Sequence, residues 1–180
     1  MGRIDVFNNL FQPTTVSGSF IAPNLPAGFT PYNIQTVNGK LYVEYAKQFS
    51  PIPGGFIGVF DLNGNLLPQI GDAHLNSPWG ITLAPATFGQ FGGDLLVGNF
   101  GDGRIGVYHE IARNRWGYRG ALRTPDQRII EINGLWGLEF GNAGPAGPKE
   151  ALYFTAGPHT WHGETVEGVR GLFGTITASG

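Results

Sequence analysis

The chain has 180 residues, enough for one domain with a substantial core, and 13 acidic against 11 basic residues give a net charge of −2. This charge argues against a nucleic-acid partner, and the absence of cysteine excludes disulfides and thiolate metal sites. No apolar stretch approaches the roughly 18 residues that a membrane-spanning helix requires, so no membrane span is expected.

The composition is typical of short strands joined by tight turns. The chain holds 30 glycines, 13 prolines and 13% aromatic residues, whereas helices need long runs free of glycine. A short apolar pattern that opens with glycine starts at residues 2, 55, 103 and 171, so its spacings are 53, 48 and 68 residues. A strand that recurs at such a period predicts an all-β fold of β-propeller blades, each a four-stranded antiparallel sheet.

Turn signals divide the chain into strands in a regular order. Asn38-Gly39 and Asn63-Gly64 are strong hairpin signals, and Pro- and Gly-rich stretches separate the other apolar runs. We expect an outer strand within 116–123, and further strands at 2–7, 14–20, 32–37, 41–46, 56–61, 65–70, 78–83, 95–100, 103–108, 135–140, 152–156 and 172–177. The one basic run, Arg113, Arg115, Arg119 and Arg123, overlaps this outer strand, and we interpret it as an exposed strand and loop.

These strands group into four units of a single partial propeller domain. Residues 1–20 form a half blade, 21–71 and 72–128 two full blades, and 129–180 a blade with three strands. Three blades cannot close a ring, whereas two chains would supply about six blades, a common propeller size. We therefore expect a homodimer in which the front strand of each chain completes the last blade of its partner. Met1 stands directly before a repeat, which we interpret as the start of a truncated chain without a signal peptide.

Three aromatic residues, Tyr32, Trp79 and Trp136, occupy the same position at the start of three consecutive inner strands. The inner strands of a propeller surround its central channel, and their ends are where we expect a ligand to bind. One interpretation is that these rings pack between neighbouring blades. The other is an aromatic rim at the channel mouth, suited to stacking on a sugar or another ring.

Oxygen-bearing side chains near the same mouth are candidate calcium ligands: Asn33, Glu44, Asn99, Asp102, Asn133 and Glu139. Calcium takes about six to eight oxygen ligands, and a bound ion can polarise a lactone or ester carbonyl and activate water. Turn chemistry alone also explains Asn99 and Asp102, and strand alternation can place Glu44 and Glu139 in solvent.

Other catalytic signals are weak. His159 and His162, followed by Glu164, have a spacing that suits a divalent metal, although a solvated loop explains them as well. The sequence contains no Gly-x-Ser-x-Gly nucleophile elbow and no phosphate-binding glycine loop that opens a helix. The catalytic residues, if there are any, stay unassigned.

Several of these motifs resemble an uncharacterised family of exported bacterial β-propeller proteins, some of which carry a C-terminal sorting tail of the PEP-CTERM type. The matching segments are 2–7, 22–29, 39–43, 46–48, 75–80, 95–103, 134–138 and 152–157. The chain resembles the C-terminal half of a typical member, and the resemblance implies an extracellular or periplasmic location. It is more distantly similar to NHL-type propellers and to gluconolactonase-like six-bladed enzymes, which concerns the fold and not the function.

Three hypotheses about function follow. The first is a binding or scaffold module, because the chain is aromatic-rich, low in charge and without a convincing catalytic set. The second is a calcium-dependent lactonase or esterase with its site at the central channel, which requires at least three oxygen ligands from different blades. The third is a propeller fragment whose assembly symmetry is its whole role. Sequence alone identifies no substrate, ligand or partner.

Overall fold

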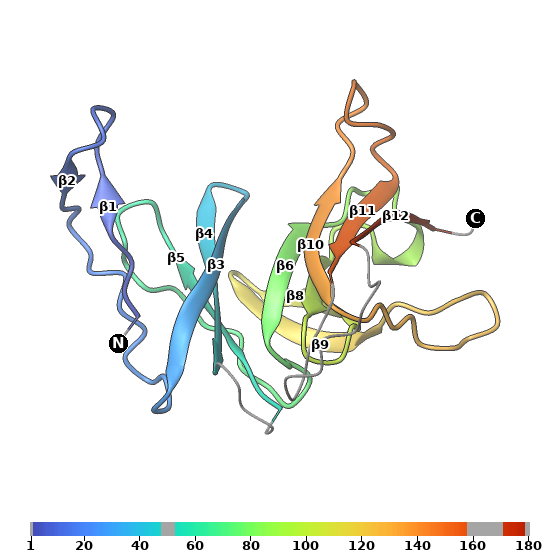
Figure 1. The fold of residues 1–180 in the computed structure, drawn as a ribbon, viewed down its shortest axis with the longest axis horizontal. Helices are drawn as coiled ribbons and strands as arrows, with labels where there is room; N and C mark the ends of the chain where they lie inside the picture. Colours follow the sequence, from blue (N-terminus) through green and yellow to red (C-terminus); the bar gives the residue numbers. More distant parts are fainter. Residues whose placement is uncertain (1, 48–52, 158–170, 179–180) are drawn as a thin grey trace.

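The structure is a computed structural model that describes residues 2–47, 53–157 and 171–178. Within these residues it contains twelve strands and one short 3-10 turn, η1 (Gly89–Phe91), which confirms the predicted all-β class (Figure 1). The strands are β1 (Val6–Phe7), β2 (Pro13–Thr14), β3 (Phe29–Val37), β4 (Lys40–Lys47), β5 (Phe56–Phe60), β6 (Pro78–Leu83), β7 (Leu95–Asn99), β8 (Ile105–Ala112), β9 (Arg115–Ala121), β10 (Leu135–Phe140), β11 (Ala151–Ala156) and β12 (Leu172–Thr177). None of the described residues forms a helix long and apolar enough to cross a membrane.

The strands form four antiparallel sheets in which neighbours in sequence are neighbours in space, as in propeller blades. The orders are β1-β2, β3-β4-β5, β6-β7-β8-β9 and β10-β11-β12. In the second sheet the outermost position is held by isolated bridges, from Ile57 to Ile70 and from Phe60 to Leu66, instead of a continuous strand. The chain therefore contains one four-stranded sheet, and the other three are narrower within the described residues.

The inner and middle strands agree with the sequence prediction, whereas two outer strands do not. Asn38 and Gly39 both have positive φ, 47° and 70°, as the tight hairpin between β3 and β4 requires. The predicted outer strand at 14–20 is wrong, because pairing there stops at Thr14 and Gly18 and Phe20 instead donate backbone hydrogen bonds to the 63–64 turn. The predicted strand at 65–70 is reduced to the two bridges described above.

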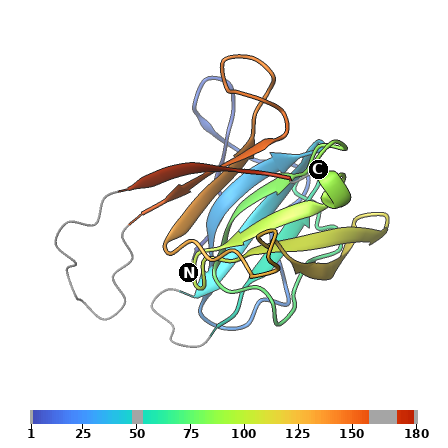
Figure 2. The ribbon, with the colours of Figure 1, turned by 90° about the vertical axis from the view of Figure 1, so that its right-hand side faces the viewer.

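The innermost strands of three sheets, β3, β6 and β10, lie side by side, with β6 in the middle (Figures 1 and 2). We call the packing of the β3–β5 sheet on the β6–β9 sheet the first seam, and that of the β6–β9 sheet on the β10–β12 sheet the second seam. Buried residues of the first seam include Tyr42, Ile57 and Ile81. Those of the second include Leu96 and Leu135. Each such side chain contributes about 1.5–3 kcal/mol by leaving water.

Candidate functional site

The three predicted aromatic residues meet at the end of the molecule where β3, β6 and β10 begin. The ring centroids of Tyr32 and Trp79 are 5.8 Å apart, and those of Trp79 and Trp136 are 4.3 Å apart in an edge-to-face arrangement. Phe100, at the end of β7, lies 4.8 Å from Trp136 and 6.5 Å from Trp79. We call Tyr32, Trp79, Phe100 and Trp136 the aromatic cluster; each of its residues is partly exposed.

A break in strand register accompanies the aromatic residue in each of the three inner strands. The pairing of β3 with β4 shifts by one residue between Pro31 and Asn33, and that of β6 with β7 shifts between Pro78 and Gly80. The pairing of β10 with β11 shifts between Leu135 and Leu138. A one-residue shift is a β-bulge, which bends the strand and changes the direction of the bulged side chain.

Phe100 is the member of the cluster that the sequence did not predict. It follows β7 and precedes the Gly101-Asp102-Gly103 turn, so its position in the repeat differs from that of the other three. The rings lie across both seams and remain partly exposed. The structure therefore combines the two geometries that the sequence left open, packing between sheets and a surface at the ends of the inner strands.

Asn33 and Glu44, two of the predicted calcium ligands, lie opposite each other on β3 and β4. The Asn33 amide nitrogen donates a hydrogen bond of 2.8 Å to the backbone oxygen of Trp79, so this side chain ties β3 to β6 across the first seam. Glu44 is fully buried, and neither carboxyl oxygen has a hydrogen-bond partner among the described residues. Burial raises the pKa of Glu44 well above its ordinary value.

Asn99 and Asp102 hold the loops of the β6–β9 sheet. The Asn99 side chain accepts a 3.0 Å hydrogen bond from the backbone nitrogen of Asn76 and donates one of 2.8 Å to the backbone oxygen of His74. Asp102 accepts a hydrogen bond from the backbone nitrogen of Arg104 in the turn that follows β7. Both residues border a polar cavity of about 170 Å³.

Asn133 and Glu139 are both exposed, before and within β10. Glu139 accepts a 3.1 Å hydrogen bond from the side chain of Gln35 on β3. Among the described residues no three His, Asp or Glu side chains are placed to share one metal ion. The remaining candidates, His159, His162 and Glu164, lie outside the described residues.

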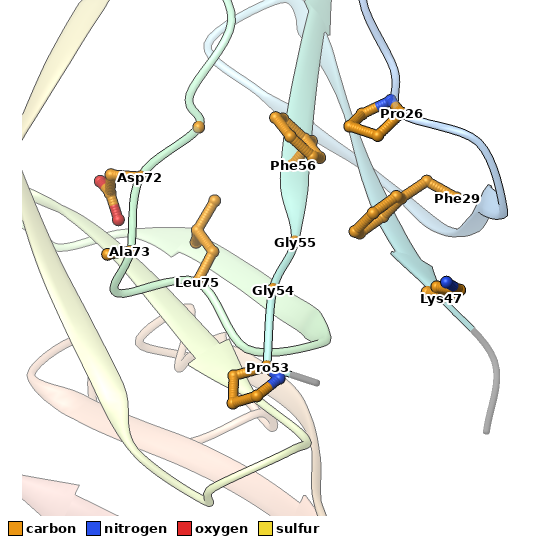
Figure 3. Close-up of a pocket in the computed structure, with 11 residues that line it drawn as sticks. Pro26, Phe29, Lys47, Pro53, Gly54, Gly55, Phe56, Asp72, Ala73 and Leu75 are labelled. Carbon is orange, nitrogen blue, oxygen red and sulfur yellow. The ribbon is translucent and has the colours of Figure 1, made fainter. Parts of the chain in front are cut away.

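A groove of about 610 Å³ opens at the same end of the molecule, beside the first seam (Figure 3). Phe29 and Phe56 form one wall with their rings edge to face at 5.1 Å, and Leu75 lies opposite them. Lys47 and Asp72 are the ionisable side chains of the described lining. No sequence pattern predicts this groove, because its walls come from segments far apart in the chain.

An ionic cluster that the sequence also did not predict lies on the β6–β9 sheet. The Asp94 carboxylate is buried and accepts 2.7 Å hydrogen bonds from Arg119 and from Nδ1 of His109. The Arg119 guanidinium also lies 5.5 Å from the centroid of the Phe91 ring. These contacts fix the loop before β7 against β8 and β9.

Comparisons with known proteins find relatives that are uncharacterised. The chain is similar to three uncharacterised proteins of Acanthamoeba polyphaga mimivirus. The first is 31% identical over 94% of this chain and 41% of the relative, and the second is 36% identical over 76% of this chain and 38% of the relative. The third is 29% identical over 86% of this chain and 30% of the relative. The chain therefore spans between 30% and 41% of the length of these relatives. No family model matches the chain. These relatives are viral, so they give no support to the expected bacterial, exported family.

One solved structure is also similar, a protein assigned provisionally as a gluconolactonase. The match has 21% identity and a TM-score of 0.49, and it covers 71% of this chain and 41% of that one.

Proposed function

We propose that this chain is a ligand-binding module built from β-propeller blades, and that its ligand contacts the aromatic cluster. The observation that carries the proposal is the repeated bulge, which accompanies an aromatic residue at the same point of β3, β6 and β10. Bulges interrupt strand pairing and are common beside functional sites. Three in equivalent places support a role for the surface that they form.

An aromatic side chain that only packs between sheets does not need a β-bulge beside it. Tyr42 is a large aromatic residue that is fully buried in the first seam, and its pairings with Gln35 on β3 and Val59 on β5 are both regular. The cluster rings differ because they are partly exposed at a strand end. Aromatic faces combined with few charges favour a ligand with flat apolar faces and hydroxyl groups, such as a sugar ring.

Tryptophan fluorescence titration with soluble hexasaccharides of glucose and of N-acetylglucosamine tests this proposal. Trp79→Leu and Trp136→Leu should each weaken binding at least about tenfold, which corresponds to about 1.4 kcal/mol. Trp116→Phe is the matched control, because Trp116 lies on β9 and donates its indole hydrogen bond to Tyr42, away from the cluster. Equal affinity for the wild type and both leucine variants would overturn the proposal.

The alternative, a calcium-dependent lactonase or esterase, needs oxygen ligands that converge from several sheets. The described residues bring no three carboxylates or imidazoles to one point, whereas the repeated bulge at the aromatic cluster supports binding. Calcium added after chelation separates the two. An ion that raises the melting temperature and restores lactone hydrolysis would favour the enzyme.

We further propose that two copies assemble by joining their open ends. Within the described residues β12 pairs only with β11, and Leu172 and Phe173 on it are 54% and 68% exposed. At the other side of the molecule the described residues of the first sheet form only two strands, β1 and β2 (Figure 1). An unpaired strand edge with exposed apolar side chains is a site for adding another strand.

Light scattering coupled to size exclusion tests the assembly. A dimer should have a mass near twice 19.3 kDa. Phe173→Asp should reduce the mass to that of one chain. Ile111→Asp is the control, because Ile111 is 65% exposed on β8, which is already paired on both sides. A wild-type chain that is monomeric at micromolar concentration would overturn the dimer.

A further inference from the structure

The buried carboxyl group of Glu44 has a structural setting that neither ligand binding nor assembly explains. Glu44 lies between Asn33 on β3 and Ile57 on β5, and shares a face of β4 with Tyr42. This face packs on β6 at the first seam, where Tyr42 and Ile57 contact Ile81 in one buried cluster. The exposed fraction of Glu44 is 0%, and both of its carboxyl oxygens lack a hydrogen-bond partner in the described part of the chain.

The elements around Glu44 provide no opposite charge. β5 and β6 contain no ionisable side chain, and β3 contributes only the phenol of Tyr32. On β4 itself the nearest ionisable neighbour on the same face is Tyr42, whose hydroxyl accepts a hydrogen bond from Trp116. The hydroxyl of Tyr108, in the same buried cluster, donates a 3.3 Å hydrogen bond to the carboxylate of Asp72. A charged Glu44 would therefore be unpaired, and burial of an unpaired charge is strongly unfavourable.

Glu44 is also close to the aromatic cluster through its neighbours. Asn33, directly opposite, donates the hydrogen bond to the backbone oxygen of Trp79, and Tyr32 is the bulged residue beside Asn33. In the equivalent pair of the next sheet both positions are glycine, Gly80 and Gly98. The carboxyl group is thus particular to the first seam and lies on the face that positions Trp79 against Tyr32.

We infer that Glu44 is a proton-operated switch of the first seam. While its carboxyl is neutral, the seam is closed and Trp79 is held against Tyr32. Loss of the proton draws water to the carboxylate, separates β4 from β6 and displaces Trp79. The claim that this switch regulates ligand binding rests on the proposed function, whereas the claim that it moves Trp79 is independent of that function.

The direction of the pH dependence follows from the setting. Burial without an opposite charge raises the pKa of Glu44, so the folded chain keeps this proton at pH values where an exposed glutamate has lost it. The closed form is therefore the low-pH form, and the seam opens as pH rises through the raised pKa. Burial also raises the pKa of Tyr45 to about 12 and raises that of Tyr42, so the tyrosines titrate at higher pH.

Near-ultraviolet circular dichroism and tryptophan fluorescence between pH 4 and pH 10 test the switch without any ligand. The wild type should show a transition that is absent from Glu44→Gln and unchanged in Glu139→Gln, the control with an exposed carboxyl. Trp79→Phe should remove most of the fluorescence amplitude. Glu44→Leu serves as a second variant if the glutamine chain does not fold, as judged by far-ultraviolet circular dichroism.

The outcomes separate the two proposals. A wild type without a transition, or the same transition in the folded Glu44 variants, would overturn the switch. A transition that depends on Glu44, in a protein whose affinity for hexasaccharides is unaffected by both Trp79→Leu and Trp136→Leu, would leave the switch standing and remove the proposed binding role. A hexasaccharide affinity that changes with pH in the wild type and not in Glu44→Gln would support both.

Discussion

Adding one methyl group at Gly80 should test how closely the inner strands approach at the second seam. A Cβ atom at Gly80 would lie 2.6 Å from the backbone oxygen of Trp136 and 2.7 Å from the backbone nitrogen of Leu138. Both are main-chain atoms of β10, so no side-chain rotation relieves the contact. At Gly137, the equivalent position of the next inner strand, the nearest atom is the Thr155 hydroxyl at 3.1 Å, which can move.

The expected change in the free energy of unfolding follows from these distances. For Gly80→Ala the two strands must separate by about 0.8 Å to restore an ordinary contact, and a gap of that size forfeits a quarter to a half of the local dispersion energy. Overpacking of this kind costs about 1–3 kcal/mol, and the less flexible unfolded alanine chain returns about 0.4–1 kcal/mol. Because the contacts at Gly80 are with main-chain atoms, the upper end of this cost applies, so we expect a net loss of about 2 kcal/mol for Gly80→Ala and about zero for Gly137→Ala.

Urea unfolding and thermal melting measure the difference, with both substitutions made in the Phe173→Asp background so that assembly plays no part. A loss of about 2 kcal/mol should lower the melting temperature of a chain of this size by roughly 4–8 °C. Equal stabilities of the two alanine variants would refute the close approach of β6 to β10, and with it the arrangement of the inner strands.

Three further predictions concern polar groups. Asp94→Asn should cost about 1–2 kcal/mol in urea unfolding, because it weakens two charge-assisted hydrogen bonds whose donors, on Arg119 and His109, are exposed enough to regain water. An unchanged midpoint would contradict this. Asn99→Ala should lower stability by about 1–2 kcal/mol and accelerate hydrogen exchange of the Asn76 amide, whose acceptor it removes. Glu44→Leu should gain stability over the wild type as pH rises above 4.5, the ordinary value for glutamate, by at most about 1.4 kcal/mol per pH unit. The unfolded wild type releases its proton there while the folded chain keeps it, so a difference independent of pH would refute the raised pKa.

The repeat pattern predicted several strands well because their signals are local. The runs at 78–83, 135–140 and 172–177 agree with β6, β10 and β12 residue for residue. Each is a short apolar run, and the pattern repeats along the chain. The outer strands depend instead on the edge against which they pair. At 14–20 the chain bonds to a turn of another unit, which no local pattern records.

The site was predicted in part for a similar reason. The equivalence of Tyr32, Trp79 and Trp136 is visible in the repeat, whereas a bulge is a property of two paired strands. Alternation along β4 allowed an exposed Glu44, but this strand lies in the middle of its sheet and is buried on both faces, with Val43 and Tyr45 packed on the opposite side. The boundaries at 20, 71 and 128 remain predictions.

The two seams are built differently, and this difference decides where the molecule can move. At the second seam Gly80 allows backbone contact with β10, and Trp79 lies 4.3 Å from Trp136. At the first seam Asn33 and Glu44 occupy the paired positions that two glycines hold in the next sheet, and Tyr32 lies 5.8 Å from Trp79. A seam held by backbone contact is disturbed by added side-chain volume. The first seam, in contrast, contains the Asn33 amide and the Glu44 carboxyl, which is unpartnered among the described residues, and it can admit water. Any change in the aromatic cluster should therefore begin with Tyr32 and Trp79, while Trp79 and Trp136 move together.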